Sequence, residues 1–169
     1  RRIGLLGGSF NPAHPGHRHV SLEALKRLGL DEVWWLVSPQ NPLKSGDGME
    51  PLATRVARAR QLANHPRIRV DAPELLLGTR YTLDTVRTLQ AAEPDAEWFL
   101  VIGQDQYAAF HTWHGWQELL GRITLAIANR PDAPLAADPQ VLQVPHAAVS
   151  LPMMDVSSTD IRERIHAGL

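Results

Sequence analysis

The sequence contains no cysteine among its 169 residues. Disulfide bonds and thiolate metal sites are therefore excluded, which agrees with a cytosolic enzyme. No apolar run approaches the ~20 residues that a membrane-spanning helix requires, and no signal-peptide pattern is visible. From these absences we expect a cytoplasmic protein that has no membrane partner.

An excess of charge of one sign is also missing. Lys and Arg number 17 and Asp and Glu number 18, which gives a formal net charge of −1. Without an overall basic field, nucleic acid is not expected to be the main partner. Hydrophobic residues make up 44 % of the chain and charged residues 21 %. This composition and length predict one globular domain over residues 1–169, and they leave open whether it forms a homo-oligomer.

The most informative stretch is IGLLGGSFNPAHPGH, residues 3–17. Its first four residues are apolar and predict a short buried strand, which ends at Gly7 and Gly8. Beyond residue 17 the apolar residues recur every three or four positions, which predicts a helix. Glycines let backbone N–H groups approach an anion closely, and a helix start adds unpaired donors and a partial positive charge. A strand, a glycine-rich loop and a helix in this order favour a phosphate site.

Two imidazoles, those of His14 and His17, stand beside this loop. Metal ligation would need further ligands, and the chain offers no cysteine for it. The two side chains could also be structural histidines with satisfied hydrogen bonds. Their position at an anion-binding loop favours phosphoryl chemistry instead.

Strands and helices are expected to alternate along the chain. The expected strands lie at residues 3–6, 33–37, 68–70, 98–102 and 123–128 and within 146–153. The expected helices follow residue 17 and lie at 52–63, 82–92, 117–120 and 157–169, with long connections at 38–51 and 129–147. This order predicts the α/β class, with a parallel sheet and helices on both faces. Ligands of such sheets bind at the carboxyl ends of the strands, near the switch in strand order.

The helix 52–63 is expected to pack through its small apolar residues. On its predicted inward face lie Ala53, Val56, Ala57 and Ala63, and two arginines, Arg55 and Arg58, lie elsewhere. The helix 82–92 is expected to point Leu83, Val86 and Leu89 inward.

A second candidate site is VSSTDIR, residues 156–162. It combines hydroxyl side chains at a predicted helix start with an arginine one turn later. Ser158 and Arg162 are four residues apart and share a helix face, so the arginine could fork onto a phosphate held there. An ordinary capped surface helix would show the same pattern.

The remaining candidates follow predicted strands or begin predicted helices. Asp105 follows Gly103 at the end of a strand, where a carboxylate could accept hydrogen bonds from ribose hydroxyls. Trp113 could be a core or cover residue. Thr82 is a plausible helix cap whose N–H groups could hold a carboxylate. Lys44, in a proline-rich loop, could reach a phosphate or merely be solvated.

These segments together resemble a known family. GGSFNPAHPGH resembles the nucleotidylyltransferase signature G-G-[ST]-F-[DN]-P followed by H-x-G-H, and residues 156–162 resemble I-S-S-T-x-I-R. The segment from Gly103 through Asp105 to Trp113 is similar to the G-x-D…W segment of the nicotinate-nucleotide adenylyltransferases. The resemblance extends from residue 3 to about residue 165. His114 departs from it, since many relatives carry Tyr after the Trp.

The resemblance implies a Rossmann-like fold and the transfer of AMP from ATP to nicotinate mononucleotide. Mg²⁺ is expected on the triphosphate, without a metal site made by the protein alone. The implied catalytic residues are His14, His17 and Arg162. The implied ATP and phosphate contacts are Gly7, Gly8, Ser9, Phe10, Ser157, Ser158, Thr159, Gly103 and Arg130. The implied acceptor contacts are Lys44, Thr82, Asp105, Trp113 and His114.

Three alternatives remain open at this point. The acceptor could be nicotinamide mononucleotide or pantetheine phosphate, or the enzyme could be a cytidylyltransferase. The chain could also be a nucleotide sensor without activity. The Gly103 to Trp113 segment argues against the other transferases, and the intact histidines and Arg162 argue against a sensor.

Overall fold

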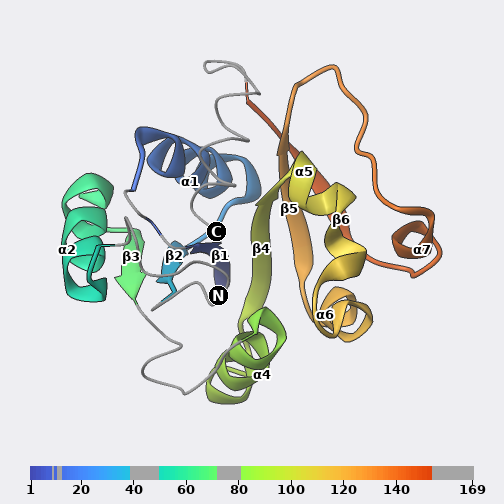
Figure 1. Cartoon of the computed structure of the whole chain (residues 1–169), viewed down its shortest axis with the longest axis horizontal. Helices are drawn as coiled ribbons and strands as arrows, with labels where there is room; N and C mark the ends of the chain where they lie inside the picture. The colour runs from blue at the N-terminus through green and yellow to red at the C-terminus, as the bar shows by residue number, and fades with distance from the viewer. Residues whose placement is uncertain (9, 11–12, 39–49, 72–80, 154–169) are drawn as a thin grey trace.

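The computed structural model describes residues 1–8, 10, 13–38, 50–71 and 81–153. Within these residues six parallel strands form one sheet in the order β3-β2-β1-β4-β5-β6 (Figure 1). They are β1 (Arg2–Gly8), β2 (Glu32–Val37), β3 (Ile68–Asp71), β4 (Glu97–Gly103), β5 (Thr124–Asn129) and β6 (Ala148–Pro152). The α/β class and the parallel sheet predicted from the sequence are confirmed.

The helices connect successive strands. They are α1 (Pro15–Leu28), α2 (Leu52–Ala63), α4 (Thr82–Ala92), α5 (Gln104–Ala108), the 3₁₀ helix η1 (Phe110–Thr112), α6 (Trp116–Arg122) and α7 (Pro139–Leu142). The predicted bounds of α2 and α4 agree with the structure, whereas α5, η1 and α7 were not expected. The predicted helix at 157–169 lies outside the described residues. In the described part of the chain, no helix has the length and apolar character needed to cross a membrane.

The two faces of the sheet carry separate hydrophobic cores, and α1 and α4 lie on opposite sides of it (Figure 1). Alternate residues of a strand point to opposite faces, so Trp35 packs with the α1 face and Trp34 with the α4 face. Both faces of the central strands are therefore buried. This explains their nearly continuous apolar sequences.

The order of the strands reverses between β1 and β4. The chain first adds β2 and β3 on one side of β1, and it then crosses to place β4 and β5 on the other side. In doubly wound sheets, ligands bind in the crevice at the carboxyl ends of the two strands where the order switches. Here the crevice lies between Gly8 at the end of β1 and Gly103 at the end of β4.

The predicted inward face of α2 is only partly confirmed, since Ala63 is buried and Val56 packs against the core, but the other two predicted positions are wrong. The side chain of Arg55 is only 1 % exposed, and Ala53 and Ala57 are exposed. The guanidinium group enters the interior because carbonyl oxygens accept from it there: Nη1 donates to Ser38 at 2.6 Å and Nε to Glu50 at 2.8 Å. Burial lowers the pKa of the Arg55 guanidinium from its usual range.

Candidate active site

Helix α1 begins at the predicted phosphate loop, with His14 as its N-cap residue in an extended conformation. Pro15 follows at the first helical position, where its missing N–H costs no helical hydrogen bond. The backbone N–H of His14 donates to Nδ1 of His17 at 2.8 Å. The two imidazole rings are stacked with centroids 5.7 Å apart. The first turn of α1 therefore joins the two predicted catalytic histidines into one local unit.

The ring of His17 is held by aromatic packing. It is 1 % exposed, and its centroid lies 4.6 Å from that of Phe10 and 5.9 Å from that of Trp35. Ser21 fixes the same turn, since its hydroxyl donates to the His17 carbonyl at 2.7 Å and accepts from Trp35 Nε1 at 2.8 Å. Few rotamers of His17 are compatible with these neighbours.

The hydrogen bond between His14 and His17 also determines the tautomer of His17. A backbone N–H can only donate, so Nδ1 of His17 accepts and carries no proton. A neutral imidazole then carries its proton on Nε2. His17 can therefore offer an N–H donor from Nε2 without carrying a positive charge.

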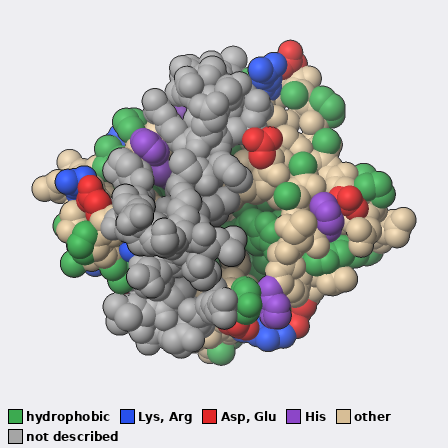
Figure 2. All heavy atoms as spheres, in the orientation of Figure 1, with side chains coloured by type: hydrophobic (Ala, Val, Ile, Leu, Met, Phe, Trp, Pro, Cys, Tyr) green, Lys and Arg blue, Asp and Glu red, His purple; other side chains and the backbone are tan. Residues whose placement is uncertain are grey.

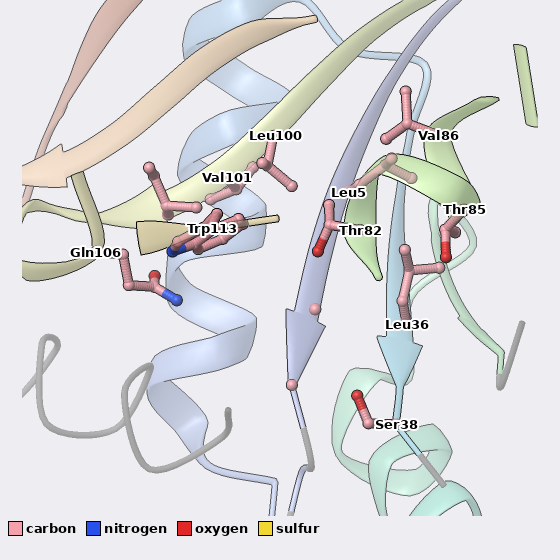
Figure 3. A pocket seen from close by; sticks show the side chains of 13 residues that line it. Leu5, Leu36, Ser38, Thr82, Thr85, Val86, Leu100, Val101, Gln106 and Trp113 are labelled. Carbon is pink, nitrogen blue, oxygen red and sulfur yellow. The ribbon is translucent and has the colours of Figure 1, made fainter. Parts of the chain in front are cut away.

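A cavity of about 100 Å³ lies at the carboxyl edge of β1 and β4, on the α4 side (Figure 3). Its walls are Leu5, Gly7, Gly8, Leu36, Ser38, Thr82, Thr85, Val86, Leu100, Val101, Ile102, Gln106 and Trp113. Figure 2 shows hydrophobic side chains at the bottom of a hollow on this face of the molecule. The pocket thus combines an apolar lining with a few polar groups, which is the usual make-up of a small-molecule site.

Gly7 contributes space to this pocket. A Cβ atom added to Gly7 would meet no atom of the described residues within 4 Å. The packing of the described part of the chain therefore does not require a glycine at this position. Its small size instead leaves the carboxyl end of β1 open to a ligand.

Trp113 closes one side of the pocket. One face of its indole ring stacks on Phe110, with centroids 4.8 Å apart and an interplanar angle of 27°. The ring also lines the pocket, so it covers the core and presents a partly exposed aromatic surface to the pocket. Thr82, at the start of α4, lines the same pocket, and the N-terminus of α4 has no side-chain cap among the described residues. The structure thus brings two of the predicted acceptor residues together.

The Trp113 segment and the start of α4 are packed against each other. Gly115 has φ +64°, and a Cβ atom there would lie 2.3 Å from Cδ2 of Leu83. Beside it, the rings of Tyr81 and His114 stack with centroids 4.2 Å apart. Only glycine allows this close approach in the left-handed conformation. His114, whose role the sequence left in doubt, therefore contacts Tyr81, the N-cap residue of α4.

An ion-pair network joins α4 to α6 on the protein surface. Glu118 accepts hydrogen bonds from the guanidinium groups of Arg87 and Arg122. These hydrogen bonds lower the pKa of Glu118 to about 2, and the bond from Arg87 makes the largest contribution. The network ties together the helices on either side of the Trp113 segment.

The other predicted contacts are placed less centrally. Gly103 ends β4, whereas Asp105 and Arg130 are exposed and do not line the pocket. The side chain of Phe10 is fully buried against His17. Any contact of Phe10 with ATP would have to come from its backbone. Ser9, Lys44, Ser157, Ser158, Thr159 and Arg162 lie outside the described residues.

Three polar residues of the pocket were not expected from the sequence: Ser38, Thr85 and Gln106. Ser38 follows β2, and its N–H donates to the Gly8 carbonyl at 2.8 Å. Gln106 had one usable signal, its position three residues after a glycine that ends a strand. That spacing is typical of a helix capping box.

The family of the chain follows from comparison with known proteins. The model of the cytidylyltransferase-like family matches residues 5–164. The chain therefore belongs to this family of nucleotide-transferring proteins. Fold and site agree with this, since the glycine-rich edge of β1 leads directly into the histidines of α1.

Curated relatives indicate the branch of the family. A probable nicotinate-nucleotide adenylyltransferase of Cereibacter sphaeroides is 42 % identical over 181 residues, which cover 95 % of this chain and 95 % of the relative. The protein of the same name from Erythrobacter litoralis is 53 % identical over 130 residues, 77 % of this chain and 59 % of the relative. The chain is a member of the nicotinate-nucleotide adenylyltransferase family.

Solved structures agree on the fold. Plasmodium falciparum nicotinic acid mononucleotide adenylyltransferase complexed with NaAD superposes with a TM-score of 0.73 at 19 % identity, covering 95 % of this chain and 82 % of that one. A putative nicotinate-nucleotide adenylyltransferase from Vibrio parahaemolyticus gives a TM-score of 0.59 at 21 % identity, covering 96 % and 85 %.

Proposed function

We propose that the protein transfers AMP from ATP to nicotinate mononucleotide, giving nicotinate adenine dinucleotide and pyrophosphate. The observation that carries the proposal is the pocket at the carboxyl ends of β1 and β4, which is lined by Gly7, Gly8, Thr82 and Trp113. The curated relatives named above support the same reaction.

In this reaction an oxygen of the acceptor's phosphate attacks the α-phosphorus of ATP. The bond from the α-phosphorus to the bridging oxygen breaks, and pyrophosphate leaves with both electrons of that bond. No covalent enzyme intermediate is needed, so the protein contributes positioning and stabilisation of negative charge. Backbone N–H groups near Gly8, the start of α1 and the Nε2–H of His17 are assigned to that charge. We assign Arg162 and the hydroxyls of Ser157 to Thr159 to the triphosphate on the motif alone.

The acceptor's pyridine ring is assigned to the free face of Trp113. Its carboxylate is assigned to the start of α4 near Thr82, where N–H donors and the helix dipole favour an anion. An indole stacks on any pyridine ring. Trp113 therefore supplies affinity, and the ring substituent decides which acceptor is chosen.

Magnesium belongs to this proposal as part of the ATP substrate. Across the described ranges, no three His, Asp or Glu side chains come together to hold a metal ion. Mg²⁺ commonly keeps several water ligands and binds through substrate phosphates, which needs no such cluster. We place the reaction in the cytoplasm, where ATP and Mg²⁺ are available.

A pyrophosphate-release assay with ATP tests the proposal against a panel of acceptors: nicotinate mononucleotide, nicotinamide mononucleotide and pantetheine phosphate. We expect kcat/KM for the acid to exceed that for the amide by at least ~10²-fold, because donors that face the amide's NH₂ group stay unpaired. Trp113→Ala should weaken both pyridine acceptors and leave their ratio roughly unchanged. Equal turnover of acid and amide by the wild type would contradict the assignment of the acceptor.

A further inference from the structure

The amide group of Gln106 has a fixed orientation. Its side chain is only 6 % exposed, and Oε1 accepts the backbone N–H of Gly103 at 2.8 Å. A backbone N–H can only donate, so the amide atom that faces Gly103 must be the oxygen. The NH₂ group of Gln106 therefore lies on the opposite side of the amide.

That NH₂ group faces the pocket. Gln106 is one of the residues lining it, and Figure 3 shows the amide nitrogen turned away from α5, the helix that carries it. Within the part of the chain that the structure describes, Nε2 donates no hydrogen bond to the protein. Amide donors in a mostly apolar pocket lose water, which costs free energy until another group accepts from them.

The start of α4 supplies a second set of donors to the same pocket. Thr82 lines it, and no described side chain caps this helix N-terminus. The pocket thus receives N–H donors from two elements, α4 and α5, and the ring of Trp113 lines the same pocket. Few acceptor atoms of the described residues face these donors, since most of the other lining side chains are apolar.

Two sets of donors discriminate between ligands in a way that one set cannot. An aromatic amide can turn its carbonyl oxygen to a single donor and its NH₂ group to solvent. When donors stand on two sides, the NH₂ group must face one of them unpaired. A carboxylate accepts on both sides.

We infer that Gln106 is a specificity-determining residue that donates from Nε2 to the carboxylate of the aromatic acceptor stacked on Trp113. The inference rests on the proposed function and assigns the acid preference to α5 as well as to α4. Gln106 thereby combines two tasks, since the same amide holds the β4–α5 turn through Oε1.

Gln106→Glu is the sharpest test. A carboxylate still accepts the Gly103 N–H, and an acidic residue in the first turn of a helix suits the helix dipole, so the fold is expected to be kept. The variant turns the donor that faces the ligand into an acceptor. It then repels the acid acceptor and matches the NH₂ group of the amide. We expect the acid-to-amide ratio of kcat/KM to fall at least ~10-fold, with the KM for ATP unchanged within about 2-fold.

Gln117→Glu is the matched control. It makes the same chemical change at an exposed position of α6, outside the pocket. We expect it to leave the ratio at the wild-type value, which separates a local contact from a general effect of added charge. The melting temperatures of both variants report whether the fold is kept.

The outcomes separate the inference from the function beneath it. If the wild type prefers the acid and Gln106→Glu keeps the wild-type ratio, the inference about Gln106 is overturned and the proposed function stands. A KM raised equally for acid and amide also overturns the inference, because the contact is then to the shared ribose phosphate. A wild type that turns over neither pyridine mononucleotide overturns the proposed function itself.

Discussion

The two edges of the parallel sheet differ in how they use their polar groups. At the amino edge, Arg1 pairs with Glu32 and Glu93, and Arg2 pairs with Glu97. At the carboxyl edge, β1 and β4 end in glycine, and α4 and α5 begin beside a pocket. The protein satisfies its own polar groups at the first edge. At the second edge it keeps donors available for a ligand, which is where function resides in folds of this type.

The largest effect that the comparison predicts concerns His17 at the carboxyl edge. His17→Ala should lower kcat by ~10²-fold or more while ATP binding is largely kept, the scale for losing one donor to developing charge. Pyrophosphate release measures kcat, and nucleotide titration measures binding. His65 is the matched control, since its Nδ1 also accepts a backbone N–H, that of Arg67 at 3.0 Å, but it precedes β3 at the amino edge. His65→Ala should keep kcat, and a loss of kcat equal to that of His17→Ala would break the comparison.

The second prediction compares a buried arginine with an exposed one. Arg55→Met removes two charge-assisted hydrogen bonds from a buried guanidinium to backbone carbonyls, so we expect the free energy of unfolding to fall by about 3 kcal/mol. Arg1→Met removes ion pairs of a side chain that is 43 % exposed, which should cost at most about 1 kcal/mol. Urea denaturation of the two variants measures the difference. Equal losses would mean that the amino-edge pairs are as stabilising as the buried contacts.

The third prediction uses two glycines that both have open space. A Cβ atom at Gly7 or at Gly121 would meet no atom within 4 Å among the residues that the structure describes. Gly7→Ala places its methyl group in the pocket. We therefore expect kcat/KM to fall about 10-fold and the melting temperature to remain unchanged. Gly121→Ala lies in α6 and should keep kcat/KM and gain about 0.5–1 kcal/mol of stability. Unchanged kinetics in Gly7→Ala would show that no ligand approaches this glycine.

The smallest effect concerns the surface ion pairs of Glu118 and depends on pH. Because Arg87 and Arg122 lower the pKa of Glu118 to about 2, its carboxylate stabilises the fold above the range where free carboxyl groups titrate. That contribution is lost as the pH falls towards 2. Glu118→Gln should therefore show a shallower loss of melting temperature between about pH 5 and pH 2 than the wild type. Parallel melting curves across this range would contradict the prediction.

Much of the fold could be predicted because its signals are local. Continuous apolar runs predicted the strands, and the bounds of α2 and α4 agree with the structure. The inward face of α2 was predicted correctly for Val56 and Ala63 but not for Arg55. A helical pattern places apolar residues inside and cannot show that two backbone carbonyls accept hydrogen bonds from a buried arginine. The five-residue helix α5 is too short to show a period.

The site could be predicted only in part. The motifs around Gly7 and Trp113 indicated two segments that the structure brings to one pocket. The hydrogen bond from His14 to His17 could not be read from the motif, since it depends on how the chain turns into α1. The capping-box spacing of Gln106 could have indicated a helix start, but not its place in the pocket, because its burial is decided by the path of the chain after β4.

The reversal of strand order between β1 and β4 has a consequence for the design of inhibitors. His17 packs with the α1 side of the sheet, and the pocket opens on the α4 side, so a compact compound in the pocket engages only half of the site. A compound that engages both halves must pass over the end of β1, where Gly7 offers no side chain in its way. Two modest fragments joined there by a thin linker would bind with an effective concentration on the order of millimolar. The carboxyl end of β1 at Gly7 is thus the position that best accommodates the linker.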